Sequence, residues 1–196
     1  MRARHNGILQ AIRRFVRERR GVSAVEFALI LPIMLTLFIG GQEVTQGITI
    51  KRKVTIATRT IADLISQDTS ISDADLTAIF AATTTVLAPY AAGPLKMKIS
   101  NIWIDADGNA SVVWGAAHNG ATPRSPGDTV TLPDGLNQFE KTSLLWAEAE
   151  YKYTPTIGYV MSGSIDLKDK LYLRPRLTNC IERVKSGQPA VGCPQT

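Results

Sequence analysis

The feature that most limits how this chain can fold is an apolar run near its N-terminus. Residues 22–39 form 18 consecutive, mostly apolar positions in which Glu26 is the single charged side chain. At 1.5 Å per residue a helix of this length spans roughly 27 Å, close to the thickness of a bilayer's hydrocarbon core. A helix in a soluble core shows polar residues at every third or fourth position, and this run does not. The run therefore predicts a membrane-spanning helix.

The charge distribution predicts the orientation of that helix. Residues 1–20 hold seven arginines and one glutamate, for a net charge of +6, whereas the other 176 residues hold 15 basic and 16 acidic side chains. The dense arginine cluster is expected to keep the N-terminus cytoplasmic, and Lys51, Arg52 and Lys53 give a weaker signal of the opposite sense. Because the basicity lies in a short arm and not on a folded face, we expect no nucleic-acid partner.

Glu26 is the most informative residue of the chain. A charged group deep in a bilayer costs on the order of 3 kcal/mol, so an acid there usually has a role and a partner. If the chain is cut between Gly21 and Val22, a positively charged amine appears about one helical turn from Glu26. The alternative is a solvated glutamate at the level of the headgroups. An ordinary signal peptide is disfavoured, because the apolar run is long and no small-residue cleavage site follows it closely.

The string RRGVSAVEFALILP, residues 19–32, resembles the start of type IV prepilins and pseudopilins. More closely, it is similar to the TadE/TadG-like proteins of tight-adherence (Tad) pilus systems, which show a basic stretch, G-x-[SA]-A-[VI]-E-[FL]-A and an early proline. The local match covers roughly 30 residues, and 147–155 and 171–176 also resemble the C-terminal half of TadE-like proteins. The matching positions near the N-terminus are Gly21, Ser23, Ala24, Val25, Glu26, Phe27, Ala28, Leu29 and Pro32.

The resemblance implies a minor pilin or pseudopilin that acts in assembly of a Tad (Flp) type pilus. A prepilin peptidase is then expected to cut between Gly21 and Val22, and Glu26 and Phe27 take the fifth and sixth positions of the mature chain. The implied partners are the membrane, the peptidase, other pilins and pilus assembly proteins. Pro32 frees a carbonyl inside the helix, which neighbouring helices of a filament could satisfy, although a plain kinked anchor explains it equally.

These inferences predict three segments. Residues 1–21 form a cytoplasmic basic leader, 22–40 a transmembrane helix in the bacterial inner membrane, and 41–196 a periplasmic pilin-like domain. We therefore expect the protein in that membrane, in the pilus or at its base. The alternative function is an uncleaved, single-pass anchored binding module outside the cytoplasm, in which Glu26 is incidental.

The rest of the chain predicts an α+β fold. Ile50, Val54, Ala57, Ile61 and Leu64 recur at helical spacing, so one helix is expected from about Val22 to Ser66, with its second half packed under a head. A second helix is expected to start at Ser72, with Asp75 completing a capping box. The pattern then changes to strands at 95–104, 110–114, 143–153 and 170–174, with a turn at 105–109 and a loop at 115–141. The clean alternation in 143–153 predicts an antiparallel sheet with one covered face.

Nothing in the sequence indicates an enzyme. It has neither a zinc-binding nor a phosphate-binding motif and no nucleophile motif, so we expect no cofactor, metal or small-molecule substrate. Asp105–Asn109 faintly resembles a calcium loop but lacks its final glutamate, and a hairpin turn explains it better. Cys180 and Cys193 are expected to form a disulfide if this end lies outside the cytoplasm; otherwise they are two unpaired thiols. The apolar segment 156–165 is either a contact surface for another subunit or a buried crossover.

Overall fold

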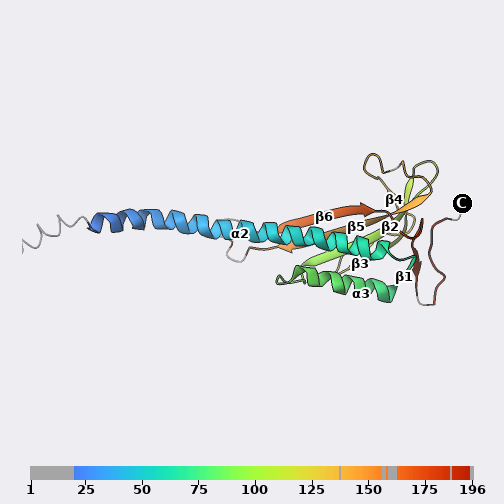
Figure 1. The fold of residues 1–196 in the computed structure, drawn as a ribbon, viewed down its shortest axis with the longest axis horizontal. Helices are drawn as coiled ribbons and strands as arrows, with labels where there is room; N and C mark the ends of the chain where they lie inside the picture. Colours follow the sequence, from blue (N-terminus) through green and yellow to red (C-terminus); the bar gives the residue numbers. More distant parts are fainter. Residues whose placement is uncertain (1–19, 137, 156–157, 159–162, 186, 195–196) are drawn as a thin grey trace, which may run out of the picture. The chain divides into compact units, whose positions relative to one another are not determined.

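The computed structural model describes residues 20–136, 138–155, 158, 163–185 and 187–194. The chain divides into two compact units, one of Met1–Thr45 with Thr156–Ser162 and one of Gln46–Pro155 with Gly163–Thr196. The basic leader predicted at 1–21 lies outside the described residues except for its last two positions, and so does most of the apolar segment 156–165. Figure 1 shows the elements and their order.

Helix α2, Arg20–Ser66, is continuous over 47 residues and confirms the single long helix expected from the sequence. Its second half carries the predicted apolar stripe, since Ile50, Val54, Ala57 and Ile61 are buried. The last member of the stripe was wrong: Leu64 is 37% exposed and Ile65 is buried in its place. At 3.6 residues per turn both positions lie near the stripe, and packing against the sheet decides between them.

Helix α3, Asp73–Thr84, begins as the sequence predicts. Ser72 is its N-cap, the Ser72 side chain accepts a hydrogen bond from the Asp75 backbone N–H, and the Asp75 carboxylate accepts one from the Ser72 N–H. A short 3-10 helix, η1 (Thr85–Leu87), follows. The Lys53 ammonium donates to the carbonyls of Val86 and Ala88, at 2.9 and 2.7 Å, and so satisfies acceptors left free where the helix ends. This contact ties α2 to η1 and the residue that follows it.

The five-stranded sheet of the second unit is antiparallel throughout and has the order β4-β3-β2-β5-β6. Its strands are β2 (Leu95–Ile104), β3 (Ala110–His118), β4 (Thr129–Val130), β5 (Thr142–Tyr153) and β6 (Ile165–Leu173). A parallel pair, β1 (Ser70–Ser72) with β7 (Glu182–Val184), forms a separate two-stranded sheet. The predicted α+β arrangement of a long helix, a small helix and an antiparallel sheet is confirmed.

One face of the sheet, the inner face, packs against both helices. Phe80 of α3 stacks on His118 of β3, with ring centroids 5.3 Å apart, and Lys51 of α2 forms an ion pair with Asp169 of β6 at 3.2 Å. Met97, which pairs with His118, is fully buried on this face. The inner face therefore holds the main core, as the alternation in β5 predicts. Its buried members on β2 and β5 are Leu95, Met97, Ile99, Asn101, Trp103, Ser143, Leu145, Ala147, Ala149, Tyr151 and Tyr153.

The outer face of the sheet is half covered. At one end Ile102, Ile104, Ala110 and Leu144 form a second apolar cluster, against which side chains of the 119–141 segment pack. At the other end charged side chains pair across strands, as between Lys98 and Glu148 at 3.2 Å. Arg124 of the 119–141 segment also pairs with Glu148 and lies over the Trp146 ring. The segment is therefore a cover that closes one end of the outer face.

Several strands are longer than the sequence predicted. The predicted strand 110–114 continues to His118, and the strand expected at 170–174 begins at Ile165. The segment 115–141, expected to be a loop, thus contains the end of β3 and the two residues of β4. Neither β1 nor β7 was predicted, because strands of three residues carry no periodic signal.

Candidate functional site

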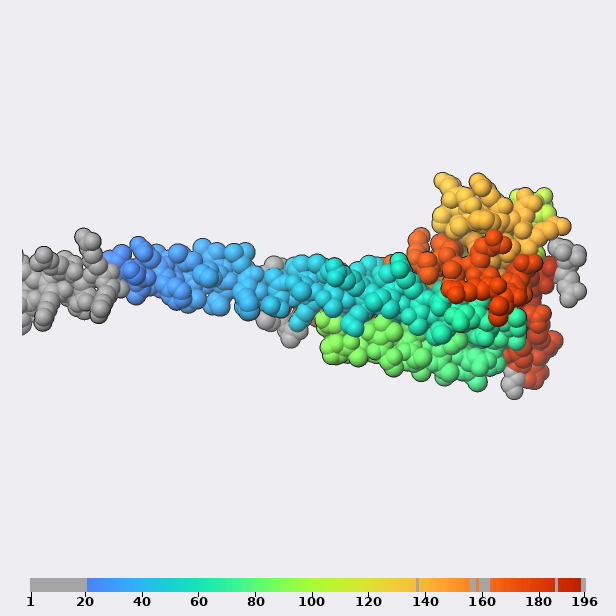
Figure 2. Space-filling view, viewed as in Figure 1, coloured from blue at the N-terminus to red at the C-terminus, as the bar shows by residue number. Residues whose placement is uncertain are grey.

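The first candidate site is the N-terminal part of α2, which is apolar on every side. Its large apolar side chains from Val22 to Phe38 are all exposed, and none of the apolar window is buried inside the protein. Figure 2 shows this stretch, coloured blue, bare on the face in view. A helix that is apolar all round is stable only in an apolar environment, supplied by lipid or by other helices. Among the described residues this is the one helix long and apolar enough to cross a membrane.

The residues of the predicted cleavage site and the acid all lie on this exposed helix. Gly21, Val22, Glu26 and Phe27 are helical and exposed. Val22 and Glu26 are four residues apart, so they lie on the same side of the helix, one turn from each other. A Cβ added at Gly21 meets no atom within 4 Å, so this position has no packing constraint in the protein itself. The structure thus brings the predicted cleavage point and the acid together on one surface.

Pro32 lies inside α2, which stays helical through it. The proline has no N–H, so the carbonyl four residues earlier lacks its usual helical donor. The Thr36 hydroxyl donates to the Pro32 carbonyl at 2.8 Å, so this polar group has its hydrogen-bond partner within the helix. Such a helix is tolerated in a membrane when neighbouring groups satisfy the freed carbonyl.

Sequence reasoning did not single out Glu43, a second acid on α2. Its side chain is 3% exposed, and its Oε1 accepts a hydrogen bond from the Gly158 backbone N–H at 2.7 Å. Gly40, one turn earlier, is also buried. The sequence signal was an acid placed two residues after the Gly40–Gly41 pair, where the apolar run ends. Glu43 thus ties Gly158 to the helix within the first unit.

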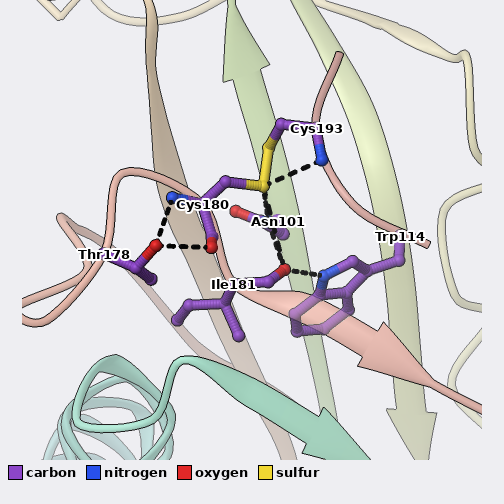
Figure 3. Close-up of a disulfide and its surroundings, with 6 residues drawn as sticks. All are labelled: Asn101, Trp114, Thr178, Cys180, Ile181 and Cys193. Atoms are coloured by element: carbon purple, nitrogen blue, oxygen red, sulfur yellow. Dashed lines mark hydrogen bonds between the residues drawn. A yellow bond between two sulfur atoms is a disulfide. The ribbon is translucent and has the colours of Figure 1, made fainter. Parts of the chain in front are cut away.

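The second candidate site is the C-terminal strap, defined as residues 176–194. Cys180 and Cys193 form a disulfide with a Cα–Cα distance of 6.0 Å. Figure 3 shows the bond above strands of the sheet, with two buried side chains aimed at the carbonyl of Ile181. The Trp114 indole Nε1 donates to this carbonyl at 2.7 Å and the Asn101 Nδ2 at 3.0 Å. The strap is thus fastened both covalently and by buried hydrogen bonds.

Backbone contacts fasten the same strap to the end of α2. The Arg176 N–H donates to the Ser66 carbonyl at 2.9 Å, and the Arg176 guanidinium pairs with Asp63. Further along, β7 pairs in parallel with β1, which begins four residues after α2 ends. The two cysteines predicted from the sequence are therefore part of a wider closure of the second unit.

The titratable groups with shifted pKa values have structural roles. Hydrogen bonds from Ser72 lower the pKa of Asp75, and hydrogen bonds from the backbone and side chain of Asn109 lower that of Asp105. Burial raises the pKa of Tyr151, and burial together with the Glu148 carboxylate raises that of Tyr172. All four lie outside the apolar helix, at a helix cap, a hairpin turn or the sheet.

No cluster of three metal-binding side chains occurs in the part of the chain that the structure describes. His118 is stacked on Phe80, and His5 lies outside the described residues. The Asp105 carboxylate accepts hydrogen bonds from the N–H groups of Asp107 and Asn109, at 2.9 and 2.8 Å, which is the geometry of a hairpin turn. The three tryptophans lie on strands, as expected for packing residues.

Comparison with known proteins places the family signal on α2. The model of a family described as TadE-like protein matches residues 21–63. This match confirms the resemblance drawn from residues 19–32 and extends it over the amphipathic half of the helix. Searches of curated proteins and of solved structures gave no match.

Proposed function

We propose that this protein is a minor pilin or pseudopilin that acts in assembly of a Tad (Flp) type pilus. The observation that supports this most is the coincidence of the TadE-like match with the exposed apolar helix that carries Glu26. In this proposal residues 1–21 are a cytoplasmic leader, 22–40 cross the bacterial inner membrane, and 41–196 form an extracytoplasmic domain. The role is structural and not catalytic, and the partners are prepilin peptidase, other pilins and pilus assembly proteins.

The exposed helix supports both an anchored and an assembled state. Apolar surface is worth about 25 cal/mol per Å² when it leaves water, so the bare helix has a large drive to enter lipid or a helix bundle. Lipid covers it while the protein is anchored, and helices of neighbouring subunits cover it after assembly. The same surface therefore serves the two states without a change in the fold of the second unit.

Glu26 favours the assembled state over the anchored state once the leader has been removed. In lipid an unpaired carboxylate costs on the order of 3 kcal/mol, and that cost falls when a positive charge reaches it. Cutting the bond between Gly21 and Val22 removes the arginines and creates an amine one turn from Glu26. The amine of a neighbouring subunit can then neutralise Glu26, so cleavage favours packing of one helix against another.

The test compares four versions of the full chain in cells that contain the matching prepilin peptidase: wild type, Gly21→Leu, Gly41→Leu and Glu26→Gln. Mass spectrometry of the membrane fraction reports the N-terminus, and pilus recovery reports assembly. We expect wild type and Gly41→Leu to begin at Val22 and to assemble, and Gly21→Leu to keep its leader. Gly41 is the matched control, because a Cβ there also meets no atom within 4 Å.

The Glu26→Gln variant separates anchoring from assembly. Neutralising the acid lowers the cost of membrane insertion, so the variant stays in the membrane fraction while pilus recovery drops. If the wild-type chain keeps its leader and Glu26→Gln assembles normally, the protein is an uncleaved, anchored binding module instead.

A further inference from the structure

Strand β3 has an edge that β4 covers only in part. On that side β3 pairs with β4 through Ala110 and Ser111, and one residue further on Val112 exchanges backbone hydrogen bonds with Gly127 and Asp128. The chain then leaves the edge at Pro126, and proline has no N–H to donate to a strand. Among the described residues, no strand pairs with β3 on this side from Val113 to His118.

A side chain of the C-terminal strap lies on this open edge. The Arg183 guanidinium donates to the carbonyl of Gly115, where a pairing strand would place a backbone N–H. Backbone groups of an antiparallel strand point alternately to its two sides, so Ala117 presents its N–H and C=O to the same edge. Arg183 thus covers one backbone position of the edge and lies beside the next.

Arg183 is held rigidly. Its Nε and Nη2 both donate to the Asp73 carboxylate of α3, at 3.1 and 2.8 Å, and its side chain is 15% exposed. Its backbone belongs to β7, which pairs with β1, and also exchanges two hydrogen bonds with Val191. Arg183 lies between the two disulfide cysteines, so the bond Cys180–Cys193 closes the loop that carries it.

We propose that the C-terminal strap guards the open edge of β3, and that its disulfide sets whether the guard is in place. With the bond formed, Arg183 blocks the edge. When the bond is broken, only hydrogen bonds, ion pairs and the β1–β7 pairing hold the strap, so Arg183 leaves the edge more readily and the edge can pair with β3 of a second copy of this chain. An uncovered strand edge is a template for such pairing, and proteins commonly blunt edges with charged side chains.

The unpaired stretch of β3 suits edge-to-edge pairing with its own copy, although the side chains of Val113, Trp114 and Ala116 are buried. Residues 113–118, VWGAAH, contain neither proline nor an acidic, lysine or arginine side chain, so two antiparallel copies bring no like charges together. The opening step is a thiol–disulfide exchange: two electrons and two protons from an external dithiol convert the bond to two thiols, and the dithiol becomes a disulfide.

The test uses the full chain in detergent micelles and measures self-association by sedimentation over a range of concentrations. Reduction with dithiothreitol should lower the concentration of half-association roughly tenfold, the effect of one or two added backbone hydrogen bonds. Arg183→Met, with the disulfide intact, should act in the same direction. Arg176→Met is the matched control, because Arg176 is an ion-paired arginine of the same strap that contacts α2 and not β3.

A second variant tests whether the association uses the open edge of β3. Adding Ala117→Pro to the reduced chain or to Arg183→Met removes the outward N–H and should restore the wild-type behaviour. Far-UV circular dichroism checks that the reduced chain stays folded; if it does not, Arg183→Met alone decides. The proposal fails if neither reduction nor Arg183→Met increases association above that of Arg176→Met, or if Ala117→Pro leaves the increase unchanged. The proposal does not depend on the pilus function.

Discussion

The two halves of helix α2 both contain many apolar residues, yet only the second half buries them within the protein. Residues 22–38 are apolar on every side and their large apolar side chains are exposed, whereas the second half buries a single stripe that includes Val54, Ala57 and Ile61. The second half finds its apolar environment in the chain's own sheet, and the first half must obtain one from lipid or from other chains. One half of a helix can therefore belong to the folded core while the other half is a surface for lipid or other chains. The content of apolar residues alone does not distinguish the two halves.

The change between the halves is marked by residues that a plain helix does not need. Gly40 and Gly41 follow the apolar run, and the buried acid Glu43 holds the backbone of Gly158. Glycine in a helix costs about 1 kcal/mol relative to alanine, so two in a row indicate a position where close approach matters more than helix propensity. Gly40, which is buried, fits that reading, whereas Gly41 has open space beside it.

The strongest test of the comparison is the same substitution in each half. Ile61 is 0% exposed and Ile33 is 62% exposed. Ile61→Ala should lower the free energy of unfolding of the second unit by about 2–5 kcal/mol, since it removes a buried side chain and leaves a cavity. Ile33→Ala should leave it unchanged within about 0.5 kcal/mol. Thermal and urea unfolding of the full chain in micelles measures both, and equal losses would show that the first half also belongs to the folded core.

A second test asks whether the outer face of the sheet is a true packing surface. A Cβ at Gly115 would lie 2.4 Å from the Arg124 carbonyl oxygen and 3.0 Å from its backbone nitrogen. Because both atoms are backbone, the 119–141 cover must move, and Gly115→Ala should cost about 1–3 kcal/mol. Gly93→Ala is the control, since a Cβ there meets nothing within 4 Å. Hydrogen exchange of the 119–141 amides should rise in the first variant and stay constant in the second.

The sequence predicted what is local in the chain. The continuous α2, the capping box of Ser72 and Asp75, the turn at Asp105 and the alternation of β5 all follow from patterns within a few residues. The candidate site around Gly21 and Glu26 could be proposed from sequence for the same reason, because all its members lie within a few helical turns; its role stays a prediction.

What the sequence did not show depends on contacts between distant segments. The pairing of β1 with β7, the bond from Arg183 to Gly115, and the anchoring of Gly158 by Glu43 join residues far apart in the chain. The 119–141 segment looked like an open loop, because its covering role depends on Val130, Leu132 and Leu136 meeting the sheet and not on periodicity. The cysteines were visible, but the buried donors Asn101 and Trp114 that receive the strap were not.

The smallest expected effect concerns how the helices begin. Helix α3 begins with a complete capping box of Ser72 and Asp75. Ser72→Ala should therefore cost roughly 1 kcal/mol of stability. It should also return the pKa of Asp75 toward its ordinary value of 3.8, because the hydrogen bonds from Ser72 hold it lower.

The sign of the pH dependence follows from that lowered pKa. The folded protein binds its proton at Asp75 less readily than the unfolded chain, so the stabilisation is complete above the ordinary carboxyl pKa and is lost as the pH falls through the lower, folded value. Unfolding curves between about pH 6 and pH 2.5 should show wild type losing its advantage over Ser72→Ala in acid. A constant difference between the two proteins across this range would mean that the capping box acts through the neutral hydroxyl alone and that the Asp75 charge adds nothing to the start of α3.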